Sequence, residues 1–270
     1  MADRGPVLAA HRAVLGSRVR AQLSYRASFA ADLVANVAIG VSEFATIYVV
    51  FSRASTLGGL DVWEASLVFA LANVCFALAD LMLGHLDRLP DHVRAGTLDA
   101  FLLRPLPVLT QLATADVSLK RLGRVGVGLA VLAIAWPRTG IALDARSAAL
   151  VAVALVGGTA VFAAVFVVAG ALQFWLLDGR EAVNSITYGG SNAAQYPASL
   201  YPAPLRWLFC YVVPAAFVAY LPVLALLGEP GPPGLPAWLG WCSPPAAVVV
   251  WGVALLLWRA GVQHYTGSGS

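Results

Sequence analysis

Long apolar runs alternate with short charged or proline-rich segments along most of the chain. Apolar runs extend from about residue 28 to 51, 62 to 84, 148 to 177 and 244 to 262. A membrane-spanning helix needs about 20 predominantly apolar residues, and each run is close to or above that length. The pattern predicts an all-α integral membrane protein in which these runs form four of the spans.

A further helix is predicted from Pro107 to the residue before Pro137, and only its second half is apolar. The first half carries the charged residues Asp116, Lys120, Arg121 and Arg124. We therefore expect that half to stand outside the lipid. Asp116 and Lys120 are spaced to form an ion pair one helical turn apart.

Residues 180–228 allow two foldings. The apolar stretch 205–227 can form the fifth span, with 180–204 as a cytoplasmic loop. Alternatively, 180–197 is a polar spanning helix, and 204–228 is a re-entrant hairpin that dips into the outer leaflet and returns. Pro214 and Pro222 interrupt the apolar stretch and favour the hairpin. Both foldings give six spans and leave the C-terminus on the side of the N-terminus.

The first 27 residues are predicted to lie on the membrane rather than across it. Apolar side chains recur on one side of a helix over residues 7–25, and arginines supply positive charge, as in interfacial helices. A cleavable signal peptide would need a continuous apolar stretch, which this segment does not have. The expected organisation is an interfacial helix over 1–27, one transmembrane domain over 28–265, and a flexible tail or expression linker over 266–270.

Composition and charge agree with a membrane protein and give it an orientation. Hydrophobic residues make up 60% of the chain and charged residues only 11%, against about 25% charged in soluble domains. With the N-terminus in the cytoplasm, thirteen of the 17 basic residues fall on the cytoplasmic side. The positive-inside rule therefore favours cytoplasmic N- and C-termini. Cys75, Cys210 and Cys242 show no paired spacing, so neither a disulfide framework nor a metal site is expected.

Several ionisable or polar side chains fall inside predicted spans. Asp32, Asn36 and Glu43 lie within about one face of the first span, and Asp80 lies near the cytoplasmic end of the second. A polar stripe at helical spacing follows in the fifth: Glu181, Asn184, Tyr188, Ser191 and Gln195. Such residues face a protein interior or a water-filled path. Substrate contact and helix-to-helix hydrogen bonding remain equally open for Asp32 and Glu43, whereas a structural role is favoured for Asp80.

Residues 85–107, HLDRLPDHVRAGTLDAFLLRPLP, form a compact charged segment between two spans. Asp91 is expected to cap a short helical turn that Gly96 ends. Thr97 is expected to cap a second helix, which Pro105 stops. The apolar face of this second helix comprises Leu98, Phe101 and Leu102, and the side chains left for polar contacts are Arg88, His92 and Arg94.

Enzymatic motifs are absent from the sequence. It contains no G-x-x-x-x-G-K-[ST] loop, so ATP hydrolysis by the usual route is excluded. It also has no H-E-x-x-H or G-x-S-x-G motif of an intramembrane enzyme. An ion-coupled secondary transporter that uses the intramembrane carboxylates remains an alternative, although no internal repeat is evident.

The order of these elements resembles the permease subunits of ABC-2 type ABC transporters, in particular a bacterial subfamily known as drug or viologen exporter permeases. The resemblance covers nearly the whole chain. The matching stretches are RAGTLDAFLLRPLP at 94–107, QYPASLYPAPLR at 195–206, VVPAAFVAYLP at 212–222 and WRAGVQHYTGSG at 258–269.

The resemblance implies roles for three groups of residues. A cytoplasmic coupling helix would dock on the ATPase subunit through Arg88, Asp91, His92, Arg94, Gly96, Leu98, Asp99, Phe101, Leu102 and Arg104. The first and fifth helices would line the pathway with Asp32, Asn36, Glu43, Glu181, Asn184, Tyr188, Ser191 and Gln195. The outer hairpin would form an extracellular gate with Pro197, Tyr201, Pro202, Pro214 and Pro222.

The resemblance further implies an exporter of small hydrophobic or cationic, drug-like compounds in the bacterial inner membrane. The chain itself would hold no cofactor, because ATP and Mg would be bound by two separate ATPase subunits. A second permease chain, identical or homologous, would complete the pathway, and a heterodimer is favoured over a homodimer. Membrane lipids are the remaining expected partners, and nucleic acid is not one of them.

Overall fold

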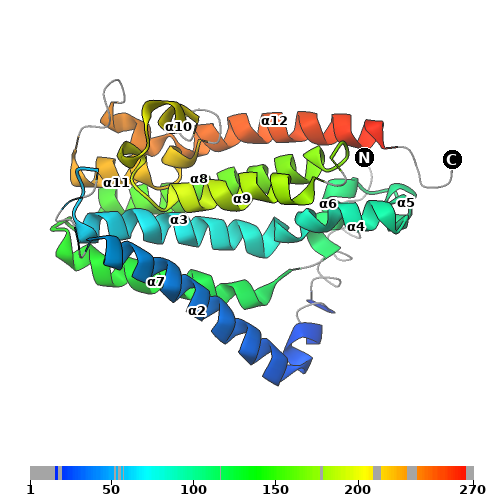
Figure 1. Ribbon diagram of the computed structural model, residues 1–270, viewed down its shortest axis with the longest axis horizontal. Helices are drawn as coiled ribbons and strands as arrows, with labels where there is room; N and C mark the ends of the chain where they lie inside the picture. The colour runs from blue at the N-terminus through cyan, green and yellow to red at the C-terminus, as the bar shows by residue number, and fades with distance from the viewer. Residues whose placement is uncertain are drawn as a thin grey trace.

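The chain forms an elongated bundle of helices whose axes run largely side by side (Figure 1). The computed structural model describes residues 16–17, 20–51, 53, 56, 58–115, 117–176, 179–208, 214–229 and 236–265. Four of the described helices are long and apolar enough to cross a membrane. They are α2 (Arg26–Phe51), α3 (Val62–Leu83), α8 (Ala145–Leu172) and α12 (Ser243–His264). Their number and hydropathy identify a multi-pass α-helical membrane protein, and they coincide with the four apolar runs in the sequence.

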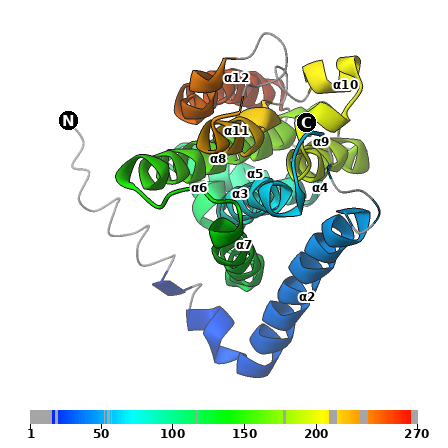
Figure 2. The same ribbon diagram turned by 90° about the vertical axis from the view of Figure 1, so that its left-hand side faces the viewer.

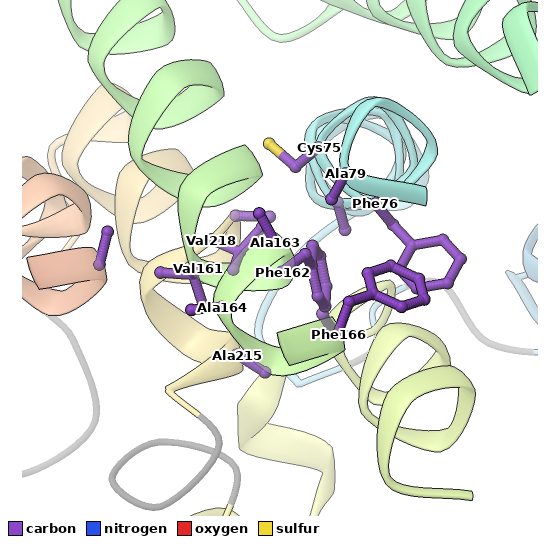
Figure 3. Packing of buried hydrophobic residues seen from close by; sticks show 14 of the residues in the cluster. Cys75, Phe76, Ala79, Val161, Phe162, Ala163, Ala164, Phe166, Ala215 and Val218 are labelled. Carbon is purple, nitrogen blue, oxygen red and sulfur yellow. The ribbon is translucent and has the colours of Figure 1, made fainter. Parts of the chain in front are cut away.

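Helix α3 lies at the centre of the bundle, between α7, α8 and α9 (Figure 2). Its Phe76 ring lies 5.3 Å from the Phe162 ring and 5.6 Å from the Phe166 ring of α8, centroid to centroid (Figure 3). A Cβ atom on Gly158 of α8 would lie 2.7 Å from Cys75 Sγ, so glycine lets the two helices approach closely. The interface between α3 and α8 forms a large part of the main hydrophobic core.

Capping boxes fix the starts of two long helices at the same end of the bundle. The Asp61 carboxylate accepts the Glu64 N–H at 2.8 Å, and the Asp61 N–H donates to the Glu64 carboxylate at 2.8 Å. Asp144 and Ser147 make the equivalent pair of bonds at the start of α8, at 2.8 and 3.0 Å. Each box satisfies two backbone N–H groups that would otherwise have no helical partner.

The single helix predicted over 107–136 is wrong. The structure divides it into α6 (Val108–Ala115), a 3₁₀ turn η2 (Leu119–Arg121) and α7 (Leu122–Ala135). The Gln22 side chain holds the break, since its amide donates to the Val117 carbonyl and its oxygen accepts the Leu119 N–H at 3.1 Å. Asp116 lies outside the described residues, and so does its predicted pair with Lys120.

The region with two possible foldings resolves into several short elements. Helix α9 (Arg180–Ala194) runs beside α3 and α8 (Figures 1 and 2). The described residues beyond it form α10 (Ala203–Trp207), the 3₁₀ turn η6 (Ala215–Phe217) and α11 (Tyr220–Leu227). One continuous helix over 205–227 is therefore wrong, in keeping with the two prolines in that stretch.

Helix α2 lies at the edge of the bundle and diverges from the other long helices toward its N-terminal end (Figure 1). It packs mainly against α7. Of the interfacial helix predicted over residues 7–25, the structure describes residues 16–17 and 20–25, and 16–17 and 20–24 are helical. The remainder of that helix and the tail at 266–270 lie outside the described residues.

Candidate functional site

The charged segment at 85–107 folds into short helices at one end of the bundle (Figure 1). These are the 3₁₀ turn η1 (Gly84–Arg88), α4 (Leu89–Arg94) and α5 (Thr97–Leu102). Gly96, between α4 and α5, has a φ of 65°. Glycine adopts this left-handed conformation without the steric cost that a Cβ atom brings. The predicted break between two helices at Gly96 is confirmed.

The predicted caps within this segment are wrong. Asp91 lies in the first turn of α4, whose N-cap is Arg88, and Gly96 rather than Thr97 is the N-cap of α5. The Thr97 hydroxyl donates instead to the His92 carbonyl at 3.3 Å and lies 2.9 Å from His92 Nδ1. Threonine therefore joins the two short helices to each other rather than capping one of them.

Three contacts anchor α5 to the rest of the bundle. The Leu98 side chain is only 1% exposed and belongs to the main core. The Gln111 amide donates to the Phe101 carbonyl at 2.8 Å. The Tyr265 hydroxyl, at the end of α12, donates to the Asp99 carboxylate at 2.9 Å. A force applied to α5 would therefore be transmitted to α6 and α12.

The residues predicted to dock on an ATPase divide into an exposed set and a set that supports it. His92, Gly96, Asp99 and Phe101 are half-buried, whereas Leu98 is buried. The Arg104 guanidinium lies 5.7 Å from the centre of the Phe101 ring, a cation–π distance. The exposed predicted residues are Arg88, Asp91, Arg94, Leu102 and Arg104. Together they form a surface of mixed charge, with three arginines and an apolar position.

The polar residues at the start of α2 face the η2 turn and α7. The Asp32 carboxylate lies 3.7 Å from the Lys120 ammonium, and both side chains are about half exposed, at 52% and 43%. The Asn36 amide donates to the Asp32 carbonyl one turn earlier at 2.9 Å. A Cβ atom on Gly123 would lie 2.8 Å from the Leu33 carbonyl oxygen, so the two helices touch here.

Glu43, further along α2, forms an ion pair in which one guanidinium nitrogen contacts both carboxylate oxygens. Arg124 Nη2 of α7 lies 2.7 Å from each Glu43 carboxylate oxygen, and the Asn73 amide of α3 donates to the same carboxylate at 3.2 Å. The Arg124 side chain is only 11% exposed, and its guanidinium lies 5.5 Å from the centre of the Phe76 ring. A buried charge needs such partners.

Asp80 forms a second buried ion pair, with Arg121 of η2. Its side chain is 4% exposed, and Gly84 leaves the space that the carboxylate fills. Arg121 also interacts with the Tyr188 hydroxyl of α9. The Tyr188 ring in turn lies 5.6 Å from the Phe76 ring. Arg121 thus links α3 to α9, whereas Arg124 links α7 to α2 and α3.

The polar residues of the stripe on α9 become less exposed from the start of the helix to its end. Glu181 is exposed, and Asn184 and Tyr188 are half-buried. Ser191 and Gln195 are only 2% and 4% exposed, within the bundle. The predicted stripe therefore exists on one helix, but its last two members face the interior of this chain.

The sequence did not reveal the partners of two arginines or the role of one asparagine. Arg121 pairs with Asp80 and Arg124 with Glu43, and the prediction that both arginines stand outside the lipid stays a prediction. Asn73, which supports Glu43, was not singled out. Ion pairs of this kind could have been predicted from the sequence, because two carboxylates in predicted spans need counter-ions and two arginines occur in the next predicted helix.

The residues predicted for the gate lie at the opposite end of the bundle from α4 and α5 (Figure 1). Pro197 follows α9, and the Tyr201 hydroxyl donates to the Ala193 carbonyl of α9 at 3.2 Å. Pro202 is the N-cap of α10. Pro214, the N-cap of η6, and Pro222, within α11, are both buried.

No group of three or more His, Cys, Asp or Glu side chains that could hold a metal ion occurs within the part of the chain that the structure describes. Three carboxylates of the described residues form ion pairs, Asp32 with Lys120, Asp80 with Arg121 and Glu43 with Arg124.

Apolar spanning helices, ion pairs between them and an anchored charged segment at one end characterise this multi-pass membrane protein. Residues 37–269 match the family model described as ABC-2 family transporter protein. The chain therefore belongs to the ABC-2 transporter family, whose members are the membrane permease components of ABC transporters. No curated protein and no solved structure gives a significant match.

Proposed function

We propose that this chain is the permease subunit of an ATP-driven exporter that carries a small hydrophobic or cationic compound out of the cytoplasm. Separate ATPase subunits bind ATP and Mg and supply the energy. A second permease chain, homologous rather than identical, completes the pathway. The chain works in the bacterial inner membrane, with six spans and both termini in the cytoplasm.

The observation that carries this proposal is the firm attachment of an exposed, charged two-helix segment to several spans. Leu98 is buried in the core, and Asp99 is bonded to Tyr265 of α12. The adjoining surface offers arginines and Leu102 to a partner. Such a segment is suited to receive a push from an ATPase and pass it to the transmembrane helices.

The buried ion pairs supply a means of changing substrate affinity. In the conformation described above, Arg124 neutralises Glu43. If rocking of α2 against α7 separates the pair, the Glu43 carboxylate becomes available to a cationic substrate. A transporter needs such a difference in affinity between two states. Asp32, Asn36 and the exposed or half-buried polar side chains of α9, namely Glu181, Asn184 and Tyr188, line the same route.

The short helices at the other end serve as the extracellular gate. Proline-rich elements cannot extend as regular helix, and Tyr201 attaches the segment to the end of α9. Movement of α9 would therefore displace Pro197, Pro202 and the hairpin together, and open the path outward.

An ion-coupled secondary transporter is the alternative function. The partly buried carboxylate of Glu43 and the buried one of Asp80 favour it, because intramembrane carboxylates serve in proton relays. The pairing of both carboxylates with arginines weighs against it, since a carboxylate held in an ion pair is not free to carry the coupling ion. The two functions differ in one requirement: the secondary transporter works without any ATPase.

Co-purification with the ATPase encoded by a neighbouring gene tests the proposal. We expect the full chain to retain the ATPase and deletion of residues 88–104 to abolish retention. Because a deletion can disturb folding, Arg88→Glu with Arg94→Glu is the second variant, and Arg259→Glu, at an exposed position near the end of α12, is the control. Retention by the deletion and by the double variant would exclude the segment as the coupling site.

A further inference from the structure

A cavity of about 560 Å³ opens at the end of the bundle that carries α4 and α5. Its walls come from three places in the sequence: the start of α2 with the residues just before it, the η1 turn, and the η2 turn. The residues used below are Phe29 and Asp32 from the first wall, Asp87 and Arg88 from the second, and Lys120 from the third. The volume is within the range of small-ligand sites, about 300–1,000 Å³.

The shape of the cavity is fixed by contacts within the chain. Gln22 bonds the backbone on both sides of Ser118, at the Val117 carbonyl and the Leu119 N–H, and so joins the α2 wall to the η2 wall. The Ser118 N–H donates to the Leu81 carbonyl of α3 at 3.2 Å. The site is therefore largely formed before any ligand binds.

Charges of both signs line this cavity. The cations are Arg88, Lys120 and Arg121, of which Arg121 forms an ion pair with Asp80, and the carboxylates are Asp32 and Asp87. Lys120 and Asp32 are 3.7 Å apart, longer than a hydrogen bond, and each remains about half exposed. Lysine has three N–H donors and a carboxylate has several acceptor sites, so both groups can bind a ligand.

A groove lined by two apolar side chains and one arginine adjoins the charged cavity. A second cavity of about 540 Å³ is lined by Leu23, Arg26 and Phe29, and Phe29 lines the first cavity as well. A ligand with a charged head and a hydrocarbon chain would fill both. The groove lies at the start of α2, the end of an apolar spanning helix, where lipid headgroups meet acyl chains.

We propose that the two cavities together bind one phospholipid with a primary amine in its headgroup, taken from the leaflet at this end of the bundle. Lys120 and Arg88 contact the phosphodiester, which is the anion that such cations bind best. Asp32 and Asp87 accept hydrogen bonds from the ammonium. The acyl chain follows Phe29 and Leu23. Two carboxylates in the site repel a purely anionic headgroup.

This inference is independent of the proposed exporter function, because lipid binding is measured without ATP, substrate or transport. Arg88 and Asp32 belong both to this cavity and to the proposed coupling surface and pathway, whereas Lys120 belongs to the cavity alone. Lys120→Gln therefore tests the lipid site without changing the proposed ATPase contact.

Native mass spectrometry of the full-length, delipidated chain in detergent tests the proposal. The probes are phosphatidylethanolamine, phosphatidylglycerol and phosphatidylcholine, with free phosphoethanolamine and inorganic phosphate as soluble probes. We expect one tightly bound phosphatidylethanolamine and weaker binding of the other two lipids. Equal binding of all three lipids would overturn the proposal. Binding of free phosphoethanolamine as tight as that of the intact lipid would also overturn it, because the groove would then contribute nothing.

Two substitutions connect the binding to these residues. Lys120→Gln should weaken phosphatidylethanolamine binding about fivefold, the effect of one cation beside a phosphate. Asp32→Asn should remove the preference for phosphatidylethanolamine over phosphatidylglycerol. Arg259→Gln, an exposed arginine near the end of α12, is the matched control and should leave binding unchanged. If Lys120→Gln does not fold, Arg88→Gln replaces it with the same expectation. Unchanged binding in both the Lys120 or Arg88 variant and the Asp32 variant would exclude this site.

Discussion

The Tyr265 hydroxyl donates a 2.9 Å hydrogen bond to the Asp99 carboxylate, across 166 positions of sequence. The bond joins the end of the last spanning helix, α12, to α5. Aromatic contacts also hold the Tyr265 ring. Its centroid lies 6.3 Å from that of Phe174, and the Phe174 centroid lies 5.6 Å from that of Trp258. The residues at the ends of α8 and α12 therefore hold α5, which belongs to the segment proposed to contact the ATPase, in one orientation.

Tyr265→Phe should loosen that attachment while keeping the ring contacts. Removing one partly exposed hydrogen bond costs about 1 kcal/mol of stability. We expect a small fall in the melting temperature. We expect a larger fall in the degree to which substrate stimulates the ATPase activity of the complex. Tyr48→Phe, at an exposed position of α2, is the control for removal of a tyrosine hydroxyl. Equal coupling in both variants would show that the bond does not transmit force.

Gly96→Ala should disturb the same segment from within. The residue has a φ of 65°, and a Cβ atom in that conformation costs about 1 kcal/mol. We expect weaker binding of the ATPase and little change in the melting temperature of the transmembrane bundle. Gly96→Asn should have a smaller effect, because asparagine tolerates the left-handed region better than alanine. ATPase retention on affinity resin measures both, and equal loss in the two variants would contradict this explanation.

Glu43 and Arg124 are suited to a double-mutant cycle. Removing one partner of a buried ion pair leaves an uncompensated charge and costs about 3 kcal/mol. Glu43→Gln and Arg124→Gln should each lower the melting temperature, whereas the double variant should recover much of the loss. Substrate-stimulated ATPase activity, measured in parallel, distinguishes a structural pair from a pathway residue. A stable double variant that keeps full stimulation would assign both residues a structural role, and additive losses of stability would mean that they are not coupled.

Several features of the fold could be predicted because they depend on local sequence. The apolar runs that form α2, α3, α8 and α12 are long enough to be recognised by hydropathy alone. The break at Gly96 was predictable for a different reason, namely that glycine between two short helical patterns commonly takes the left-handed conformation.

The features that could not be predicted depend on contacts distant in sequence. The break between α6 and α7 is held by Gln22, about a hundred residues away, so no local signal marks it. The directions of Arg121 and Arg124 depend on where Asp80 and Glu43 lie in the folded bundle. The sequence pattern of one helix does not distinguish an arginine that pairs with a carboxylate of another helix from an arginine that faces solvent.

Gly126 and Gly128 of α7 form a matched pair of sites for testing helix contact. A Cβ atom on Gly128 would lie 2.6 Å from Val74 Cγ2 and 3.3 Å from the Ala70 carbonyl oxygen, whereas one on Gly126 meets nothing within 4 Å. Gly128→Ala should destabilise the protein by about 1–3 kcal/mol, because α7 and α3 must separate. Gly126→Ala should be neutral or stabilising by up to about 1 kcal/mol. Thermal unfolding in detergent measures both, and the opposite order would contradict the contact between α3 and α7.

Asp144 at the start of α8 gives the protein a specific dependence on pH. The Ser147 N–H and hydroxyl hold the pKa of the Asp144 carboxyl below its ordinary value of 3.8, because they stabilise the charged form. A lowered pKa means that the folded state binds the proton less tightly than the unfolded state. The stabilisation is therefore fully present above the ordinary pKa and is lost as the pH falls below it.

Asp144→Asn isolates this contribution, because asparagine accepts the same N–H bond but does not titrate in this range. At pH 7 we expect the natural chain to have a higher melting temperature than the variant. The difference between the two melting temperatures should shrink as the pH is lowered from about 5 toward 3. Melting temperatures of both proteins across that range measure the effect. Asp91→Asn, an exposed aspartate at the other end of the bundle that caps no helix, is the control. A difference between the natural chain and Asp144→Asn that stays constant with pH would mean that the cap does not depend on the charge of Asp144.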